Sequence, residues 1–296
     1  MIQLVPAVDL LFEAVAEKGH VCVGLDTSPD YVPPLERRKA ENDAEAVLAF
    51  NKALIDATCE IAACFKVQIA YYEEMGVSGL RAYSETLKYI RQKRCISIAD
   101  IKRGDIADTA LRYAKAHFLG DFKADFVTLN PYMGMDAIEP WLKEARMLGT
   151  GAFVLMRTSN PGMRDFEYLE TKDGKRLYNA VGGKMSALAE KNRGHHGYGL
   201  FGIVVGCTER DEAAQIRQDY PELFFLIPGY GAQGGGAQDA ALLLREGNGG
   251  VVNASRSIIT AWQKEAEAEN ADNNFAADAA KRAAVKMRDE IRGIIK

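Results

Sequence analysis

The stretch CISIADIKRGDIADT, residues 95–109, passes from an apolar run into a row of charges. Its first part predicts a short strand over 95–99, because β-branched isoleucines recur within it. Side chains two apart on a strand share a face, so Asp100 and Lys102 are expected to point the same way. A turn should follow, and the apolar spacing of residues 105–120 predicts a helix. A strand that leads through a turn into a helix is the repeating unit of α/β folds.

Eight short apolar runs, including the one at 95–101, alternate along the chain with segments of helical periodicity. Asn42, with Glu45 three residues later, predicts the capped start of one of these helices. Strands that are apolar on both faces and separated by helices predict a parallel sheet covered by helices. Eight such repeats predict a closed (β/α)8 TIM barrel, with a doubly wound open sheet as the alternative. The runs lie at 21–26, 64–70, 95–101, 126–131, 152–158, 200–207, 224–231 and 249–254.

Composition fits one α/β domain over residues 1–296, in which residues 162–199 are expected to form an insertion. A net charge of -4 without a basic stripe argues against nucleic acid as a partner. No apolar stretch approaches the roughly 20 residues of a membrane-spanning helix, and residues 1–18 carry acidic groups that a signal peptide lacks. The five cysteines include no Cys-x-x-Cys pair, so they are expected to be reduced packing residues. We therefore expect no membrane partner and a cytoplasmic location.

Charged side chains gather where the predicted strands end, and catalytic groups of a (β/α)8 barrel lie at the C-terminal ends of its strands. Alone, each charge has a structural explanation, such as a turn cap for Asp26 or a snorkelling side chain for Lys66. Their coincidence on one rim favours a functional site. The charged groups are Asp26, Lys66, Asp100 and Lys102, and the polar ends of strands four and five are Asn130-Pro131 and residues 158–162.

The last two strands indicate a ligand with a phosphate group. Strand seven runs into a glycine-rich stretch, residues 227–236, and strand eight ends at residues 253–257. Loops after these strands commonly bind phosphate in this fold, because glycines let backbone N–H groups approach an anion. Arg256 would add a bidentate charge, and Gln233 could reach the phosphate or the base. A merely flexible loop is the alternative for the glycine run.

Taken together, these residues resemble the orotidine 5'-phosphate decarboxylase family in its longer bacterial form, over essentially the full chain. The family carries a lysine on strand two, matched by Lys66, and an Asp-x-Lys-x-x-Asp run on strand three. Asp100, Lys102 and Asp105 match that run. The resemblance implies that these four residues catalyse decarboxylation of orotidine 5'-phosphate to UMP and CO2, the last step of de novo pyrimidine nucleotide synthesis.

The resemblance also implies a homodimer with shared active sites, in which Asp105 and Thr109 reach into the partner's site. Two residues depart from the better-known short form: Ser255 replaces a glycine before the phosphate arginine, and Tyr230 replaces a small aliphatic residue. The implied substrate contacts are Asp26 with a hydroxyl, Ser159 with the pyrimidine, Thr109 with the ribose, and Gln233 and Arg256 with the phosphate.

The implied chemistry fits the residue types. Removal of CO2 from C6 of a pyrimidine leaves a carbanion without an adjacent carbonyl group. The sequence shows no pyridoxal-lysine, thiamine or metal motif, so neither cofactor nor metal is expected and stabilisation would be electrostatic. Lys102 is suited to donate the proton, while Asp100 would lie beside the departing carboxylate.

Three alternatives stay open. A magnesium-dependent sugar-phosphate decarboxylase or aldolase of the related barrel family shares the strand-three run, but it places an acidic metal ligand where this chain has Lys66, whose charge repels a divalent cation. A Schiff-base aldolase is disfavoured, because flanking aspartates should keep Lys102 protonated. A non-catalytic nucleotide-binding barrel would have no need for the charges on the opposite rim.

Overall fold

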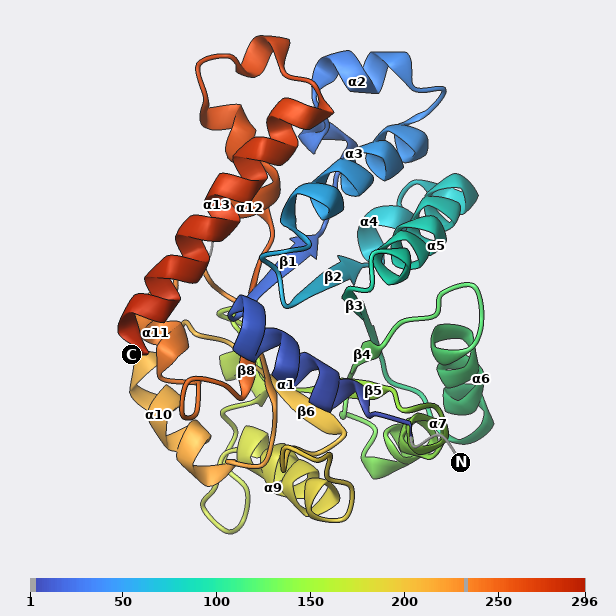
Figure 1. Cartoon of the computed structure of the whole chain (residues 1–296). Coiled ribbons are helices and arrows are strands. Elements are labelled where there is room, and N and C mark those ends of the chain that lie inside the picture. Colours follow the sequence, from blue (N-terminus) through green and yellow to red (C-terminus); the bar gives the residue numbers. More distant parts are fainter. Residues whose placement is uncertain (1–3, 232–233, 296) are drawn as a thin grey trace.

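The computed structural model describes residues 4–231 and 234–295. Its eight strands form a closed parallel barrel in sequence order, because β1 pairs with both β2 and β8 (Figure 1). The predicted (β/α)8 barrel is confirmed, and the open-sheet alternative is wrong. The strands are β1 (Val21–Leu25), β2 (Cys64–Gln68), β3 (Ile96–Arg103), β4 (Phe126–Leu129), β5 (Gly151–Arg157), β6 (Phe201–Val205), β7 (Phe225–Ile227) and β8 (Gly250–Ala254).

Helices surround this barrel, and the long C-terminal helix α13 packs along α3 on one side (Figure 1). The α-helices are α1 (Ala7–Lys18), α2 (Pro34–Lys39), α3 (Asp43–Thr58), α4 (Ala70–Glu73), α5 (Gly76–Gln92), α6 (Ala107–Phe118), α7 (Glu139–Leu148), α8 (Met163–Phe166), α9 (Leu177–Glu190), α10 (Arg210–Asp219), α11 (Ala237–Ala241), α12 (Arg256–Ile259) and α13 (Asn273–Ile294). Short 3-10 turns are η1 (Pro29–Tyr31), η2 (Met135–Ala137), η3 (Ala261–Lys264) and η4 (Ala268–Asn270).

Helix α3 shows how the local sequence sets an element. The Asn42 side chain accepts a hydrogen bond from the Glu45 backbone N–H at 3.1 Å, so the predicted cap is confirmed. Beyond the cap, Val47, Phe50 and Leu54 are fully buried at helical spacing. Burial of such a side chain contributes about 1.5–3 kcal/mol, so this apolar stripe is a main contribution to holding the helix on the barrel.

Strand β3 is longer than predicted, because it continues through the charged residues to Arg103. Its pairing with β4 shifts register between Ala99 and Arg103, and Lys102 adopts a positive φ of 45°. A bulge of this kind re-aims side chains, and a non-glycine residue in the left-handed region costs roughly 1–3 kcal/mol. The strand therefore carries Asp100 and Lys102 into the mouth of the barrel through a strained bulge, not through regular alternation.

Helix α1 lies across the opposite, N-terminal end of the barrel. Asp9 is buried there and accepts hydrogen bonds from the backbone N–H groups of His195 at 2.9 Å and His196 at 3.1 Å. The imidazole of His196 stacks on Phe12, with ring centroids 4.2 Å apart. Both histidines are exposed and far from the strand ends that carry the charges, as expected for surface residues.

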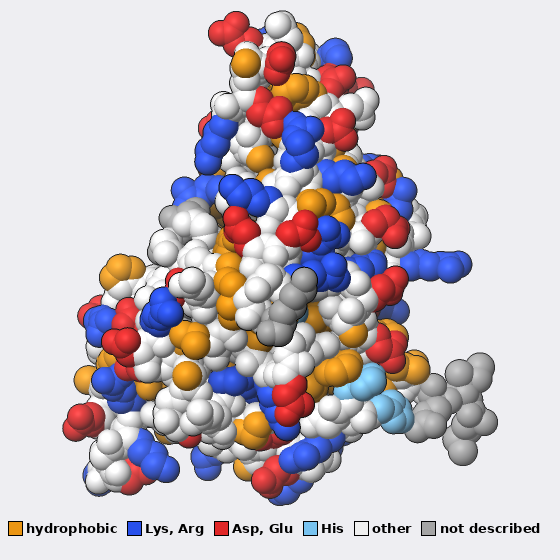
Figure 2. All heavy atoms as spheres, turned by 60° about the vertical axis from the view of Figure 1, so that its left-hand side comes forward, with side chains coloured by type: hydrophobic (Ala, Val, Ile, Leu, Met, Phe, Trp, Pro, Cys, Tyr) orange, Lys and Arg blue, Asp and Glu red, His pale blue; other side chains and the backbone are white. Residues whose placement is uncertain are grey.

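The segment after β5, residues 162–199, contains the barrel's own crossover helix, since α9 packs against β5 and β6. The additional length lies on either side of α9, at 162–176 and 191–199. All five cysteines are free and four are buried, which confirms that they are packing residues. Lys and Arg side chains alternate with Asp and Glu over the face drawn in Figure 2. Among the described residues, no helix combines the length and apolar character needed to cross a membrane.

Candidate active site

A continuous chain of ion pairs links the first three strands at the C-terminal mouth of the barrel. Lys66 Nζ donates to Asp26 Oδ1 at 3.0 Å and to Asp100 Oδ2 at 2.9 Å. Lys102 Nζ donates to Asp100 Oδ1 at 2.6 Å. The structure thus brings together all four charged groups that the sequence placed on this rim.

Asp100 is the centre of this network. Gln68 Nε2 donates to its Oδ2 at 3.0 Å, and the Thr128 hydroxyl donates to its Oδ1 at 2.8 Å. With the two lysines, these contacts give each carboxylate oxygen two donors and fill its acceptor capacity. Thr128 Oγ1 also accepts the backbone N–H groups of residues 101 and 102 at 3.0 Å each, which holds the β3 bulge in place.

Sequence reasoning missed Gln68 and Thr128. Gln68 could have been found, because it lies two residues after Lys66 on the same strand and therefore on the same face. Thr128 gave no such signal, because it lies inside an apolar run and acts only through the register of β4 against β3.

The network fixes the charge of its buried members. Asp100 and Lys66 are each 5% exposed. Burial alone would raise the pKa of Asp100, but the attraction of Lys66 and Lys102 outweighs it and holds that pKa below its usual range. Burial likewise opposes the charge of Lys66, yet Asp100 and Asp26 raise its pKa. A carboxylate and an ammonium thus persist in the interior, where such pairs are costly unless fully bonded.

Lys102 differs from Lys66, because 46% of its side chain is exposed and it faces a cavity. That cavity has a volume of about 300 Å³, which is at the lower end of the range for small-ligand sites. Charged groups line one side of it and apolar side chains from β5–β7 line another, a combination suited to a flat heterocycle that carries a charged substituent. The lining residues are Asp26, Lys66, Gln68, Asp100, Lys102, Thr128, Leu155, Thr158, Ser159, Asn160, Val204, Leu226, Pro228 and Asn253.

The loop that carries Ser159 is packed tightly against its neighbours. A Cβ atom at Gly206 would lie 2.8 Å from the Cβ of Ser159, and one at Gly229 would lie 3.4 Å from it. The backbone N–H of Gly206 also donates to the carbonyl of Arg157 at 2.8 Å. The loops after β5, β6 and β7 therefore form one packed wall of the cavity.

Asp26 connects the network to the last strand. Ser255 Oγ donates to Asp26 Oδ2 at 2.8 Å. A Cβ atom at Gly24 would clash with that hydroxyl, so only glycine at this position leaves room for it. Ser255, a departure from the short form, thus joins the end of β8 to the charge network on β1.

Three other predicted residues, Arg256, Asp105 and Thr109, are not among those that line the cavity, and a fourth cannot be placed. Arg256 is exposed at the first position of α12, and Gln233 lies outside the described residues. Asp105 accepts a hydrogen bond from the backbone N–H of its neighbour Ile106 at 2.8 Å, and Thr109 is exposed on α6. The single chain therefore assembles the charged side of the site without Arg256, Asp105 or Thr109.

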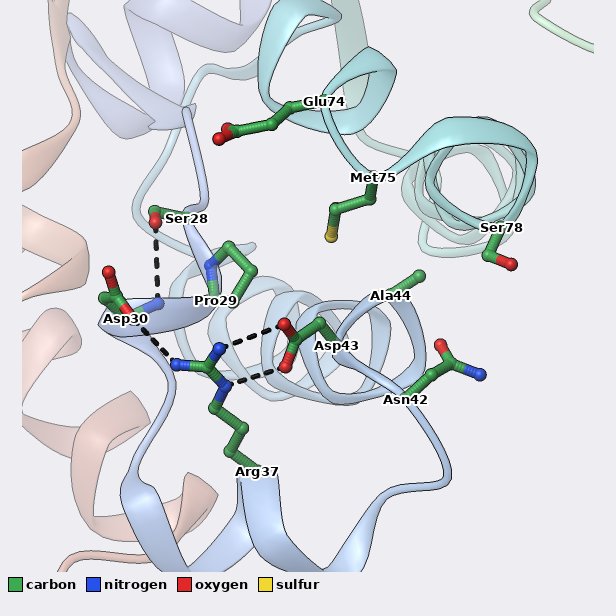
Figure 3. Close-up of a pocket in the computed structure, with 10 residues that line it drawn as sticks. All are labelled: Ser28, Pro29, Asp30, Arg37, Asn42, Asp43, Ala44, Glu74, Met75 and Ser78. Atoms are coloured by element: carbon green, nitrogen blue, oxygen red, sulfur yellow. Dashed lines mark hydrogen bonds and ion pairs between the residues drawn. The ribbon is translucent and has the colours of Figure 1, made fainter.

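A larger hollow of about 480 Å³ lies outside the barrel mouth, between η1, α3 and α5 (Figure 3). Arg37 at its edge donates to both oxygens of Asp43 at 2.7 and 2.9 Å, and to Asp30 at 2.7 Å. Because two carboxylates already occupy the guanidinium, this arginine braces the loop and offers no free charge to an anion. The smaller cavity with the buried charges is the candidate active site.

Comparison with known proteins agrees with this geometry. Residues 19–271 match the model of the orotidine 5'-phosphate decarboxylase / HUMPS family. Orotidine 5'-phosphate decarboxylases from Clostridium perfringens and Clostridium acetobutylicum are each 54% identical to the chain, over 97% and 96% of it and 98% of their own length. The structure of Leishmania donovani OMP decarboxylase covers 98% of this chain and 99% of its own, with 30% identity and a TM-score of 0.76. With a Lys-Asp-Lys network at the mouth of its barrel, the chain belongs to the orotidine 5'-phosphate decarboxylase family.

Proposed function

We propose that this protein catalyses the cofactor-free decarboxylation of orotidine 5'-phosphate to UMP and CO2. The observation that carries the proposal is Asp100, held by four donors between a buried lysine and a half-exposed one at the edge of a cavity. This arrangement suits a reaction whose main demand is stabilisation of negative charge at one carbon atom.

Lys102 supplies the cation for that carbon. Its ammonium group is anchored to Asp100 at 2.6 Å while the rest of the side chain remains open to the cavity. As CO2 leaves C6, the ammonium stabilises the developing carbanion and then donates a proton to it, which yields UMP. The strained backbone at Lys102 is set before the substrate arrives, so the reaction itself costs little reorganisation.

Asp100 and Lys66 keep the surrounding charges in place. Asp100 lies where the substrate carboxylate would leave, and the four donors prevent it from turning away or taking up a proton. Lys66 balances Asp100 and Asp26 and holds them together. The proximity of two carboxylates is relieved when CO2 departs.

The other side of the cavity binds the nucleotide. Ser159 lines the cavity and would contact the pyrimidine, and Asp26, on the charged side at the end of β1, would bind a substrate hydroxyl. Arg256 and Gln233, on the loops after β8 and β7, would bind the phosphate. Binding energy from this non-reacting group offsets the cost of bringing the charges together.

A second copy of the chain completes the site in our proposal. Asp105 and Thr109 do not line the cavity of their own chain, and large apolar side chains lie exposed on the adjacent loops, with Tyr132 at 84%, Met133 at 48% and Ile106 at 41%. The two loops are joined by a hydrogen bond from the Asn130 N–H to the Arg103 carbonyl. A homodimer would cover this surface and bring Asp105 and Thr109 into the partner's site.

Subunit complementation tests the shared site. Lys102→Ala and Asp105→Ala homodimers should each be inactive, while an equal mixture, dissociated and reassociated, should recover about a quarter of wild-type activity because half the dimers hold one intact site. A mixture that stays inactive would contradict the shared arrangement.

The magnesium-dependent alternative is less consistent with the site. Lys66 Nζ already bonds the two carboxylates that a divalent cation would need, and its charge would have to be displaced first. A Schiff-base mechanism needs a free amine, whereas Lys102, the lysine considered for that role, is bound through its Nζ to Asp100 at 2.6 Å.

A cytoplasmic location is also part of the proposal. Five free cysteines, four of them buried, suit a reducing compartment. The reaction supplies UMP for pyrimidine nucleotide synthesis. This reaction needs neither a membrane nor a nucleic acid as a partner.

The direct experiment is to incubate the purified protein with orotidine 5'-phosphate and to follow the fall in absorbance together with UMP formation. We expect turnover that is unchanged by EDTA. Turnover that EDTA abolishes would favour the metal-dependent alternative, and UMP binding without any turnover would favour a non-catalytic nucleotide-binding barrel.

A further inference from the structure

In the segment after β5, one carboxylate, that of Glu167, forms hydrogen bonds with a residue of the cavity wall. Glu167 follows α8 and accepts a hydrogen bond from the Thr158 backbone N–H at its Oε2 and one from the Thr158 hydroxyl at its Oε1, each at 2.8 Å. Both carboxylate oxygens are therefore committed to a single residue, which fixes its orientation. Thr158 lines the cavity and directly precedes Ser159.

The Thr158 hydroxyl has two competing acceptors. Its oxygen lies 2.7 Å from Asn160 Oδ1, which also lines the cavity. A hydroxyl carries one proton, and an ionised carboxylate is a stronger acceptor than an amide. Glu167 therefore draws the proton away from Asn160. Without Glu167, the hydroxyl would bond Asn160 and the Thr158 N–H would lose its acceptor.

Glu167 is held firmly because its segment is anchored to α10. Arg164 pairs with Glu209 at 2.7 Å, and Arg176 pairs with Glu212. Tyr168 donates to the same Glu212 at 2.6 Å. The guanidinium carbons of Arg164 and Arg176 lie 5.0 and 4.2 Å from the centroid of its ring. These contacts stand on either side of Glu167 in the sequence.

Helix α10 in turn follows the β6 loop that packs on Ser159. Thr208 Oγ1 donates to the Ser159 carbonyl at 3.4 Å, and Gly206 leaves no space for a side chain beside it. Residues 158–160 are thus held on one side by hydrogen bonds to Glu167 and on the other by contacts with the β6 loop. The segment that carries Glu167 and the β6 loop that leads into α10 are themselves joined by the ion pairs to Glu209 and Glu212, so both contacts come from one connected part of the molecule.

We propose that Glu167 is a positioning residue that holds Thr158, Ser159 and Asn160 against the pyrimidine base, and that the segment at 162–176 exists in this chain to supply that hold. The inference deepens the proposed function and rests on it. Glu167 itself touches neither the base nor the reacting carbon, so it acts through the loop.

The test separates the base from the rest of the nucleotide. We would measure the dissociation constants of UMP and of ribose 5-phosphate, which lacks the base, for the wild type, Glu167→Ala and Glu167→Gln. Loss of the two bonds from Thr158 frees the loop, and this should weaken UMP binding about 10-fold in Glu167→Ala, which corresponds to roughly one hydrogen bond to the base. Ribose 5-phosphate should bind as it does to the wild type. Glu167→Gln keeps an acceptor for the Thr158 N–H, so it should recover part of the UMP affinity lost in Glu167→Ala. The same variant replaces Glu167→Ala in the test if the alanine variant fails to fold.

Asp165→Ala is the matched control, because Asp165 is an exposed carboxylate in the same segment. It should leave both dissociation constants and the melting temperature unchanged. Equal weakening of UMP and ribose 5-phosphate by the Glu167 variants would overturn the proposal, as would wild-type UMP affinity. Kinetics add a second readout, since KM for orotidine 5'-phosphate should rise more than kcat falls. The binding measurements need no turnover, so a failure of the proposed reaction would be recognised separately in the wild type.

Discussion

The two halves of the barrel mouth differ in how far a single chain completes them. In the half made by β1–β4, the charged groups bond one another, and Asp100 has all its acceptor positions filled. In the half made by β5–β8, Arg256 is exposed and the wall at Ser159 is shaped mainly by close packing of loops. In our proposal the charged half serves the chemical step and the other half binds the nucleotide, so the groups for chemistry are preorganised by their own bonds, whereas Arg256 is left exposed to meet the phosphate.

The largest expected effect comes from Lys102→Ala in the charged half. Loss of the cation and proton donor should lower kcat by roughly 10⁴-fold, the upper range for such groups. UMP binding should survive, because the binding half is untouched. Steady-state kinetics and calorimetric titration with UMP measure the two properties. Near-normal turnover would remove Lys102 from the chemistry.

Lys66→Ala tests whether the charged half is also a structural unit. The variant leaves the buried Asp100 and the partly buried Asp26 without their shared partner, and breaking a buried pair costs about 3–5 kcal/mol of unfolding free energy. Urea denaturation measures this loss. Lys88→Ala is the matched control, because its pair with Glu85 is half-exposed and should contribute under about 0.5 kcal/mol. Equal losses in both variants would contradict a special role for the buried network.

Arg256→Ala tests the binding half. Loss of the charged contacts to phosphate should lower kcat/KM for orotidine 5'-phosphate by about 10²-fold, with an unchanged melting temperature. Turnover of orotidine, which lacks the phosphate, should be the same in the variant and the wild type. If both substrates suffered equally, Arg256 would act on something other than the phosphate.

The smallest expected effect concerns His117, which is buried behind the charged half between Phe122 and Trp141. Burial lowers the pKa of His117 to about 4, with Arg103 adding to the effect. The unfolded chain binds a proton at higher pH, so the stability this histidine contributes is present above pH 6.5 and is lost as pH falls toward 4.

The variant His117→Phe should therefore flatten the acid limb of the stability curve, by about 2 kcal/mol between pH 7 and pH 5. His20, whose pKa burial also lowers to about 4, should account for much of the remaining slope. An unaltered slope in His117→Phe would show that the folded protein tolerates the charged imidazole.

The sequence predicted the features that depend on the periodicity and the type of residues close together in the chain. Alternating apolar runs predicted all eight strands, and Asp26, Lys66, Asp100 and Lys102 were placed on one rim because parallel strands end on the same side of a barrel. The β3 bulge could not be predicted, because Thr128 on the neighbouring strand holds it. The role of Glu167 was equally hidden, since it depends on how the segment after β5 folds back onto Thr158.

The roles of Asp105 and Thr109 come from the family resemblance, whereas Arg256 and Gln233 were predicted from the loops after strands seven and eight. Their roles depend on a second chain or on a bound nucleotide, which a single sequence does not contain. They stay predictions for the complementation and phosphate experiments.

The order of the charged strands along the chain has a consequence for folding. The bonds of Lys66 to Asp26 and Asp100 span 40 and 34 residues, whereas the Ser255–Asp26 bond that reaches the last strand spans 229. Short loops close at lower entropic cost, so a nascent half-barrel of β1–β4 can neutralise its own interior charges before the ring exists. Pulse-labelled hydrogen exchange during refolding should find the amides of β2 and β3 protected earlier than those of β8. During synthesis, these lysine and aspartate side chains would then pair with one another before the apolar interior of the barrel closes around them.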